Sequence, residues 1–208
     1  MRRLSGAVAV VVVTLGFAVA ASGATQAKVT VIGDSVADAM EHSPRALANL
    51  RRGFRVKLDT RGCRRLRAPG CTIAGTSGPP ATTLQVVKRL GKSLGKVVVV
   101  DVGYNDTPER YGRDLEAVMR ALQKVGVETV IWLTLRDPNR DYAASNADIR
   151  SEPQDWPQLI VADWDEHSDG QSSWFQADGI HLTEIGAAKL GAFINDALQQ
   201  HAMPARPF

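Results

Sequence analysis

The 208-residue sequence is poor in aromatic residues and in cysteine. Phe, Trp and Tyr make up 6% of it, and nothing in it resembles a nucleic-acid-binding module, so we do not expect nucleic acid as a partner. The two cysteines, Cys63 and Cys71, have no histidine at a metal-ligand spacing. Their surroundings therefore argue against a zinc site, and we expect no metal.

Long apolar runs are also scarce, and the clearest one lies at the N-terminus. Arg2 and Arg3 precede Ala7–Ala21, an uncharged stretch of 15 residues followed by small residues, which is typical of a secretory signal peptide. Because a spanning helix needs about 20 apolar residues, we expect cleavage between about residues 20 and 27. An uncleaved anchor is the rival interpretation. No cysteine precedes Cys63, which argues against a lipid anchor near this terminus.

The remaining residues, 28–208, are expected to form one secreted or extracytoplasmic domain without a membrane span. In an exported chain, two closely spaced cysteines usually pair, so we predict a disulfide between Cys63 and Cys71. The sequence does not indicate an oligomeric state.

Charge of both signs is present but unevenly spread. The formal net charge is +3, yet residues 45–67 contain nine Lys or Arg and a single acid, Asp59. Such a basic strip either binds phosphate, an anionic glycan or a membrane surface, or is a solvated helix face followed by a charged loop.

Apolar runs and helical patterns alternate along the chain. Short β-branched or apolar runs predict strands, and spaced apolar residues predict helices between them. The predicted strands are 29–32, 54–58, 97–102, 129–135 and 159–162, and the predicted helices are 36–50, 82–94, 110–125 and 184–200, the last capped by Thr183. This alternation predicts an α/β fold, a parallel sheet of about five strands with helices on both faces.

Three short motifs follow or close these elements, and each carries a group that acyl transfer needs. They are Gly33-Asp34-Ser35, Gly103-Tyr104-Asn105-Asp106 and Asp178-Gly179-Ile180-His181. Together they supply a serine nucleophile, an amide donor, a carboxylate and an imidazole. Ligands of parallel sheets bind beyond the carboxyl ends of the strands, where Ser35 and Asn105 both fall. We expect Asp34 and Asp106 to make loop hydrogen bonds, and Gly103 to permit close backbone approach.

In this order, the three motifs resemble those of the SGNH, or GDSL-type, hydrolase superfamily, over residues 28 to about 200. The resemblance implies a flavodoxin-like three-layer α/β/α sandwich. It implies that Ser35 is the nucleophile, His181 the general base and Asp178 the residue that orients His181. It also implies an oxyanion hole made by the backbone N–H of Ser35, the side chain of Asn105 and one further backbone N–H. In place of the family's glycine after the second strand stands Asp59-Thr60-Arg61-Gly62-Cys63-Arg64, so either Gly62 or Cys63 supplies that N–H, with Cys63 favoured.

The segment before His181 is rich in aromatic residues, and it resembles exported SGNH domains that move acetyl groups on cell-wall glycans. Trp164, Trp174 and Phe175 either line an acyl or sugar pocket or simply pack. We expect a cofactor-independent esterase acting on a small-molecule or glycan acyl ester, such as O-acetyl groups of envelope glycan. The alternatives are an O-acyltransferase that uses the same acyl-enzyme and a non-catalytic glycan-binding module on the same fold.

Overall fold

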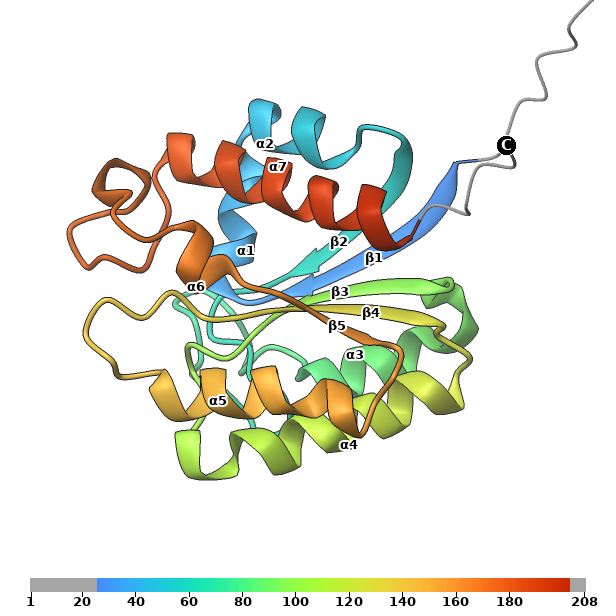
Figure 1. The fold of residues 1–208 in the computed structure, drawn as a ribbon. Helices are drawn as coiled ribbons and strands as arrows, with labels where there is room; N and C mark the ends of the chain where they lie inside the picture. Colours follow the sequence, from blue (N-terminus) through green and yellow to red (C-terminus); the bar gives the residue numbers. More distant parts are fainter. Residues whose placement is uncertain (1–25, 203–208) are drawn as a thin grey trace, which may run out of the picture.

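Residues 26–202, which the computed structural model describes, fold around a five-stranded sheet placed between two layers of helices (Figure 1). Every strand pairs in parallel, in the order β2-β1-β3-β4-β5. The strands are β1 (Ala27–Gly33), β2 (Phe54–Thr60), β3 (Val97–Asp101), β4 (Thr129–Leu133) and β5 (Leu159–Ala162). The α/β sandwich expected from the sequence is therefore confirmed.

Helices cover both faces of the sheet (Figure 1). The helices α1 (Ser35–Asp38), α2 (Pro44–Leu50) and α7 (Glu184–His201) lie on one face, and α3 (Thr83–Leu90), α4 (Tyr111–Lys124) and α5 (Ala143–Ser151) lie on the other. A short helix, α6 (Trp164–His167), follows β5. Residues 26–202 also form five 3₁₀ turns: Ala39–His42, Gly91–Leu94, Pro108–Arg110, Glu152–Gln154 and Ser172–Trp174.

The core has two halves, one on each side of the sheet, because the strands carry apolar side chains on both faces. Val29, Val31 and Ile131 point into the half beneath α7, and Val98 and Val130 into the half beneath α4. All five residues of β3 are buried, as expected for a strand covered on both sides.

The helix predicted over residues 36–50 is wrong as a single element. The structure divides it into α1, a 3₁₀ turn and α2, and the break falls at Ser43 and Pro44. Pro44 has no N–H to continue a helix but fits the first helical position, while Ser43 caps α2 by accepting the N–H of Ala46 at 3.2 Å. No helix was predicted where the structure has α5, because this segment has no regular stripe of apolar residues.

The signal peptide predicted for residues 1–27 lies almost wholly outside the described residues. Within them, β1 begins at Ala27, whose register partner is Phe54. No helix of residues 26–202 has the length and apolarity needed to cross a membrane.

Candidate active site

Ser35 is the first residue of α1, directly beyond the carboxyl end of β1. The chain turns sharply here because Gly33 has no side chain: a Cβ on Gly33 would lie 2.2 Å from the Cβ of Ala37. Asp34 caps the helix, and its Oδ1 accepts the N–H of Val36 at 3.0 Å. β1 lies between β2 and β3, where the strand order reverses, so Ser35 occupies the topological switch point of the sheet.

His181 reaches Ser35 from the loop that precedes α7. Its Nε2 lies 3.1 Å from Ser35 Oγ, and its Nδ1 lies 2.6 Å from Asp178 Oδ2. Asp178 Oδ1 accepts the backbone N–H groups of Ile180 and His181, both at 2.9 Å, so the turn holds the carboxylate and the imidazole together. Gly179 has φ +72° inside this turn, a conformation that favours glycine.

The electrostatics of the pair favour a charged carboxylate at Asp178. Burial works against the charge, but the N–H groups of Ile180 and His181 and the imidazole outweigh it, and they hold the pKa of Asp178 below its usual value. An ionised Asp178 accepts the Nδ1–H of His181. This bond selects the tautomer in which Nε2 is free to accept the hydroxyl proton of Ser35.

The carboxylate of Asp34 ties the serine turn to the loop after β3. Its Oδ2 accepts the backbone N–H of Gly103 at 3.1 Å and that of Tyr104 at 3.3 Å. Asn105 follows in this loop, and its Nδ2 donates to the carbonyl of Arg64 at 3.4 Å. Gly103 permits the close approach expected of it, because a Cβ there would lie 2.7 Å from Leu135 Cδ1.

Two buried carboxylates lie beneath the site. Asp34 is fully buried, and burial raises its pKa to about 6 although three backbone N–H groups lower it. Asp101, at the end of β3, is also fully buried, and neither carboxylate oxygen has a hydrogen-bond partner within the described residues. Burial and the nearby charge of Asp34 raise the pKa of Asp101 well above its usual value.

Asp106 also makes the loop contacts expected of it. Both of its carboxylate oxygens accept the N–H of Leu66 at 3.1 Å, which connects the β3 loop to the loop after β2. Burial raises the pKa of Asp106 to about 7, against the effects of that N–H and of the Arg65 guanidinium.

The loop after β2 is shaped by the predicted disulfide, which joins Cys63 and Cys71 across a Cα–Cα distance of 5.3 Å. Cys63 has φ +58°, an uncommon conformation for a residue with a side chain. Gly70 packs against it so tightly that a Cβ would lie 1.7 Å from the Cys63 carbonyl oxygen. Within residues 26–202, the backbone N–H groups of Gly62 and Cys63 donate to no other protein group.

These groups meet in one cleft of about 460 Å³. The sequence-predicted residues Ser35, Gly62, Cys63, Asn105, Asp178 and His181 all line it. Residues from four separate parts of the chain thus converge at one edge of the sheet.

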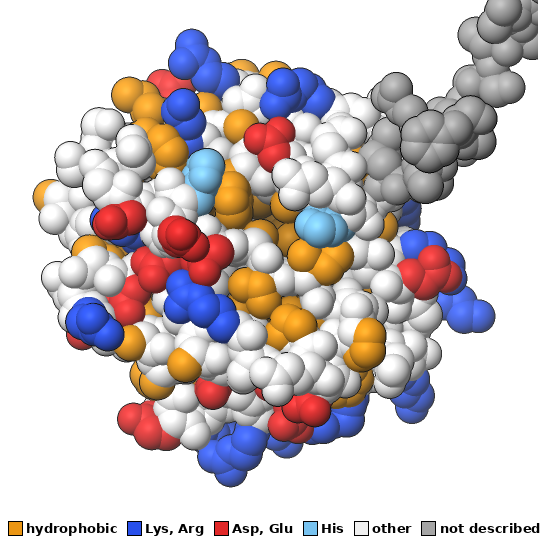
Figure 2. Space-filling view, in the orientation of Figure 1, with side chains coloured by type: hydrophobic (Ala, Val, Ile, Leu, Met, Phe, Trp, Pro, Cys, Tyr) orange, Lys and Arg blue, Asp and Glu red, His pale blue; other side chains and the backbone are white. Residues whose placement is uncertain are grey.

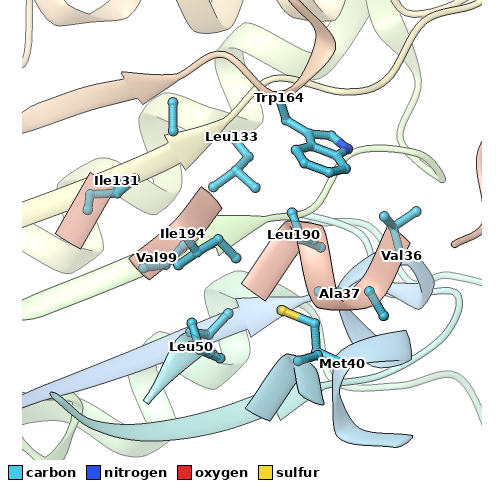
Figure 3. Close-up of a cluster of buried hydrophobic side chains, with 14 of the residues drawn as sticks. Val36, Ala37, Met40, Leu50, Val99, Ile131, Leu133, Trp164, Leu190 and Ile194 are labelled. Carbon is cyan, nitrogen blue, oxygen red and sulfur yellow. The ribbon is translucent and has the colours of Figure 1, made fainter. Parts of the chain in front are cut away.

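The three aromatic residues considered for a substrate pocket do not line this cleft. Trp164 is fully buried, and Trp174 and Phe175 are 9% and 6% exposed. Trp164 stacks on Trp174 at 5.8 Å between ring centroids and packs against Phe193 of α7, so these rings pack in the core of the structure. Figure 3 shows Trp164 beside Leu133 and Leu190 in the core between the sheet and α7.

The aromatic and apolar side chains that do line the cleft were not predicted from the sequence. Tyr104, Tyr142, Ile73 and Ile180 line it, and the rings of Tyr104 and Tyr142 meet edge to face at 5.2 Å. Tyr104 belongs to the second motif, and its position next to Asn105 could have indicated that it lines the cleft. Nothing in the sequence pattern singled out Tyr142 or Ile73.

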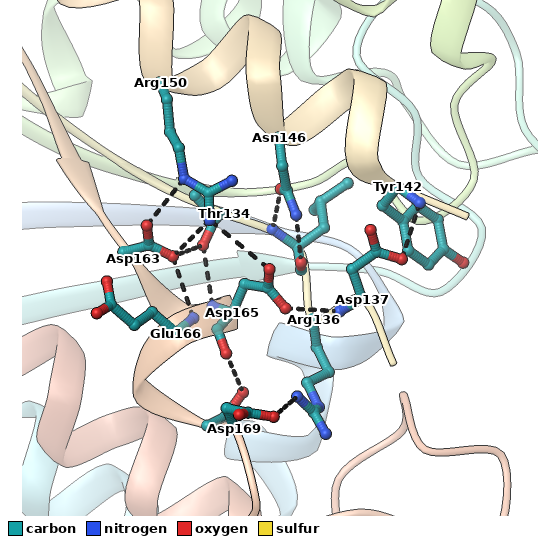
Figure 4. A network of polar contacts seen from close by, with 12 residues as sticks. Thr134, Arg136, Asp137, Tyr142, Asn146, Arg150, Asp163, Asp165, Glu166 and Asp169 are labelled. Carbon is teal, nitrogen blue, oxygen red and sulfur yellow. Dashed lines mark hydrogen bonds and ion pairs between the residues drawn. The ribbon is translucent and has the colours of Figure 1, made fainter. Parts of the chain in front are cut away.

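A polar network beyond β4 and β5 holds Tyr142 in place (Figure 4). The N–H of Tyr142 donates to Asp137 Oδ1 at 3.0 Å, and the N–H of Asp137 donates to Asp165 Oδ1 at 2.8 Å. Arg150 binds Asp163 through Nε and Nη2, at 2.9 and 3.0 Å. In the space-filling view, acidic side chains gather around basic ones in the region of α6 (Figure 2).

Comparison with solved structures finds the same fold in other proteins. No protein-family model and no curated protein matches the sequence. The solved structure of TesA matches with a TM-score of 0.62 and 20% identity, over 83% of this chain and 98% of that one. A carbohydrate esterase family 3 protein from Talaromyces cellulolyticus matches with 0.56 and 15%, over 84% and 97%. A Clostridium thermocellum family 3 carbohydrate esterase matches with 0.56 and 16%, over 85% and 99%.

These similarities extend along nearly the whole length of the matched proteins. They confirm the three-layer α/β/α fold that the resemblance implies. At these levels of identity the likeness concerns the fold, and the activity has to be argued from the site.

Proposed function

We propose that the protein is an exported serine esterase that hydrolyses short acyl esters, O-acetyl groups of envelope glycan among them, through an acyl-Ser35 intermediate. The observation that carries the proposal is the continuous contact from Asp178 through His181 to Ser35, with atom separations of 2.6 and 3.1 Å. This is the spatial arrangement of a nucleophile, a base and an orienting acid.

In the first half of the reaction, Ser35 Oγ gives its proton to His181 Nε2 and bonds to the ester carbonyl carbon. The carbonyl π electrons move onto oxygen. When the tetrahedral intermediate collapses, the bond to the alcohol oxygen breaks and His181 Nε2–H protonates that oxygen. The products are free alcohol and acyl-Ser35.

In the second half, water gives a proton to His181 Nε2 and attacks the acyl carbon. The Ser35 oxygen then leaves and recovers its proton from the imidazole, which releases the acid. Both steps pass through an oxyanion, for which the site offers the backbone N–H of Ser35, the Asn105 amide and the N–H of Gly62 or Cys63. Each such donor contributes about a hundredfold or more in rate.

The cleft supports a short acyl group. Its volume of about 460 Å³ is shared with the alcohol part of the ester, and Tyr104 and Tyr142 limit it on one side. Two of the matched structures are carbohydrate esterases, which supports a glycan as the alcohol. The Cys63–Cys71 disulfide is compatible with a location outside the cytoplasm, which the proposed signal peptide would provide.

The test is hydrolysis of p-nitrophenyl acetate, butyrate and octanoate by the wild type, by Ser35→Ala and by His181→Ala. We expect rates that fall with acyl length and that drop at least about a thousandfold in both variants. His42→Ala is the matched control, because His42 also contacts an aspartate, Asp38 at 3.5 Å, but lies outside the cleft.

Three results would contradict or redirect the proposal. Activity that survives Ser35→Ala would refute the mechanism. Slow hydrolysis with fast transfer of the acyl group to added glycan would identify an acyltransferase. A folded wild type without any acyl-enzyme would favour a glycan-binding module.

A further inference from the structure

A second cavity of about 460 Å³ lies beside the active-site cleft. Ile73 lines both cavities and so forms the border between them. The Ile73 side chain rests on Gly62, since a Cβ on Gly62 would lie 3.1 Å from Ile73 Cδ1. We call this second cavity the basic pocket, because four of its lining residues are Lys57, Arg61, Arg64 and Arg89.

The two acids of the basic pocket leave part of this positive charge uncompensated. Asp59 Oδ1 lies 2.7 Å from Arg64 Nη2, and Asp59 Oδ2 lies 2.7 Å from Arg89 Nη2, so one carboxylate serves two guanidinium groups. The second acid, Glu41, accepts the hydroxyl of Thr60 at 2.7 Å. Four cations therefore face two carboxylates.

Lys57 and Arg61 are the cations left for a ligand. Within residues 26–202 neither makes an ion pair with a carboxylate, and the Arg61 guanidinium donates to the carbonyl of Thr60 at 2.7 Å. By contrast, Arg64 is 1% exposed, and its guanidinium also donates to the carbonyl of Ala81 at 3.0 Å. Arg64 thus builds the wall of the pocket, and Lys57 and Arg61 supply the free charge.

We propose that the basic pocket is a subsite for an anionic group, a carboxylate or a phosphate, on the same glycan whose acyl ester is held at Ser35. The inference rests on the proposed esterase function and specifies its substrate class. A cavity of this size accommodates a sugar ring. The planar guanidinium of Arg61 can donate two parallel hydrogen bonds to two oxygens of such an anion. Walls of low dielectric constant concentrate the field of the two free cations.

The shape of the basic pocket favours a polymer over a membrane surface. A flat bilayer cannot enter a cavity bordered by Ile73, whereas a chain that crosses Ile73 brings the neighbouring sugar into it. Arg61, which lines the basic pocket, directly precedes Gly62, which lines the active-site cleft, so consecutive residues of one loop face the two cavities. The basic strip of residues 45–67 therefore acquires a function at this point.

The test compares two O-acetylated oligosaccharides that differ at one carbon, with acetate release as the readout. One is built of galacturonate, which carries a carboxylate, and the other of galactose, which carries a neutral hydroxymethyl group. We expect kcat/KM to be about tenfold higher for the galacturonate substrate at low salt, about threefold for each free cation. The preference should vanish at high ionic strength. A third substrate with a 6-phosphate distinguishes phosphate from carboxylate recognition.

The variants Lys57→Gln and Arg61→Gln should each lower the ratio of the two kcat/KM values about threefold, and the double variant about tenfold. Arg113→Gln with Lys124→Gln, two exposed cations of α4 outside both cavities, is the control that leaves the ratio unchanged. A wild-type ratio near one, or a ratio that survives the double variant, overturns the inference.

Binding separates this inference from the esterase proposal. Ser35→Ala should bind unacetylated trigalacturonate by calorimetry, and the added Lys57→Gln and Arg61→Gln changes should abolish that binding. If p-nitrophenyl acetate is not hydrolysed but trigalacturonate binds in this way, the esterase proposal fails and the basic pocket stands. If p-nitrophenyl acetate is hydrolysed and trigalacturonate does not bind, the basic pocket alone is refuted.

Discussion

Replacing Asp34 by asparagine tests how the buried carboxylate beneath the nucleophile affects stability. Asp34 is fully buried and accepts three backbone N–H groups, from Val36, Gly103 and Tyr104. An asparagine amide keeps one acceptor oxygen, but its NH₂ group replaces the other oxygen and faces backbone N–H groups that need an acceptor. At pH 4.5, Asp34→Asn should therefore be less stable than the wild type, by about 1–3 kcal/mol, because buried N–H donors lose their acceptor.

The size of this destabilisation should depend on pH. Burial raises the pKa of Asp34 from 3.8 to about 6, so the folded protein holds this proton more tightly than the unfolded chain. The contribution of Asp34 to stability is then full below pH 3.8 and decreases as the pH rises to about 6. The total loss is about 3 kcal/mol, of which about 2 kcal/mol falls between pH 4.5 and pH 8. Asparagine does not titrate and escapes this loss.

The free energy of unfolding, measured by urea denaturation at pH 4.5 and pH 8, provides the assay. The difference between wild type and Asp34→Asn should shrink by about 2 kcal/mol from the lower to the higher pH. Asp141→Asn, at an exposed carboxylate, is the matched control. A difference between wild type and Asp34→Asn that stays constant over this range would refute the reasoning.

Three further predictions concern the disulfide, the serine turn and the core. Reduction of the Cys63–Cys71 bond should lower kcat about a hundredfold, the effect of one oxyanion donor, before the domain unfolds; a rate that falls only together with global unfolding would contradict this. Gly33→Ala should cost about 3 kcal/mol of stability, because its Cβ would lie 2.2 Å from a methyl group of α1. Gly78→Ala, with nothing within 4 Å, should be nearly neutral when both variants are compared by urea denaturation. Trp164→Ala should destabilise the protein by about 3–5 kcal/mol without changing the order of rates among acyl esters, and a changed order would return Trp164 to the substrate pocket.

The sequence was most informative where a reactive side chain directly follows a strand. Ser35 and Asn105 follow two parallel strands, so strand position alone predicts that both lie at the same edge of the sheet. The structure adds that these strands, β1 and β3, are neighbours. His181 precedes α7, and its reach to Ser35 depends on the turn at Gly179, which no periodicity encodes.

The features that the sequence did not predict have a common physical cause, which is that burial is a property of the whole fold. Trp164 and Trp174 are near His181 in sequence, yet their large apolar rings are more stable between the sheet and α7 than in an open cleft. Tyr142 lines the cleft from a loop that is bound through Asp137 to Asp165, contacts that no sequence pattern predicts. The charge imbalance of the basic pocket emerges only after Asp59 has been assigned to Arg64 and Arg89.

The central claim, that Ser35 is an activated nucleophile, is tested most directly by labelling the protein with an alkyl p-nitrophenyl phosphonate. Peptide mass spectrometry then locates the adduct. The account predicts a single adduct on Ser35, formed quickly in the wild type, at least about a hundredfold more slowly in His181→Ala, and absent in Ser35→Ala. A folded wild type without an adduct, or an adduct on another residue, would contradict it.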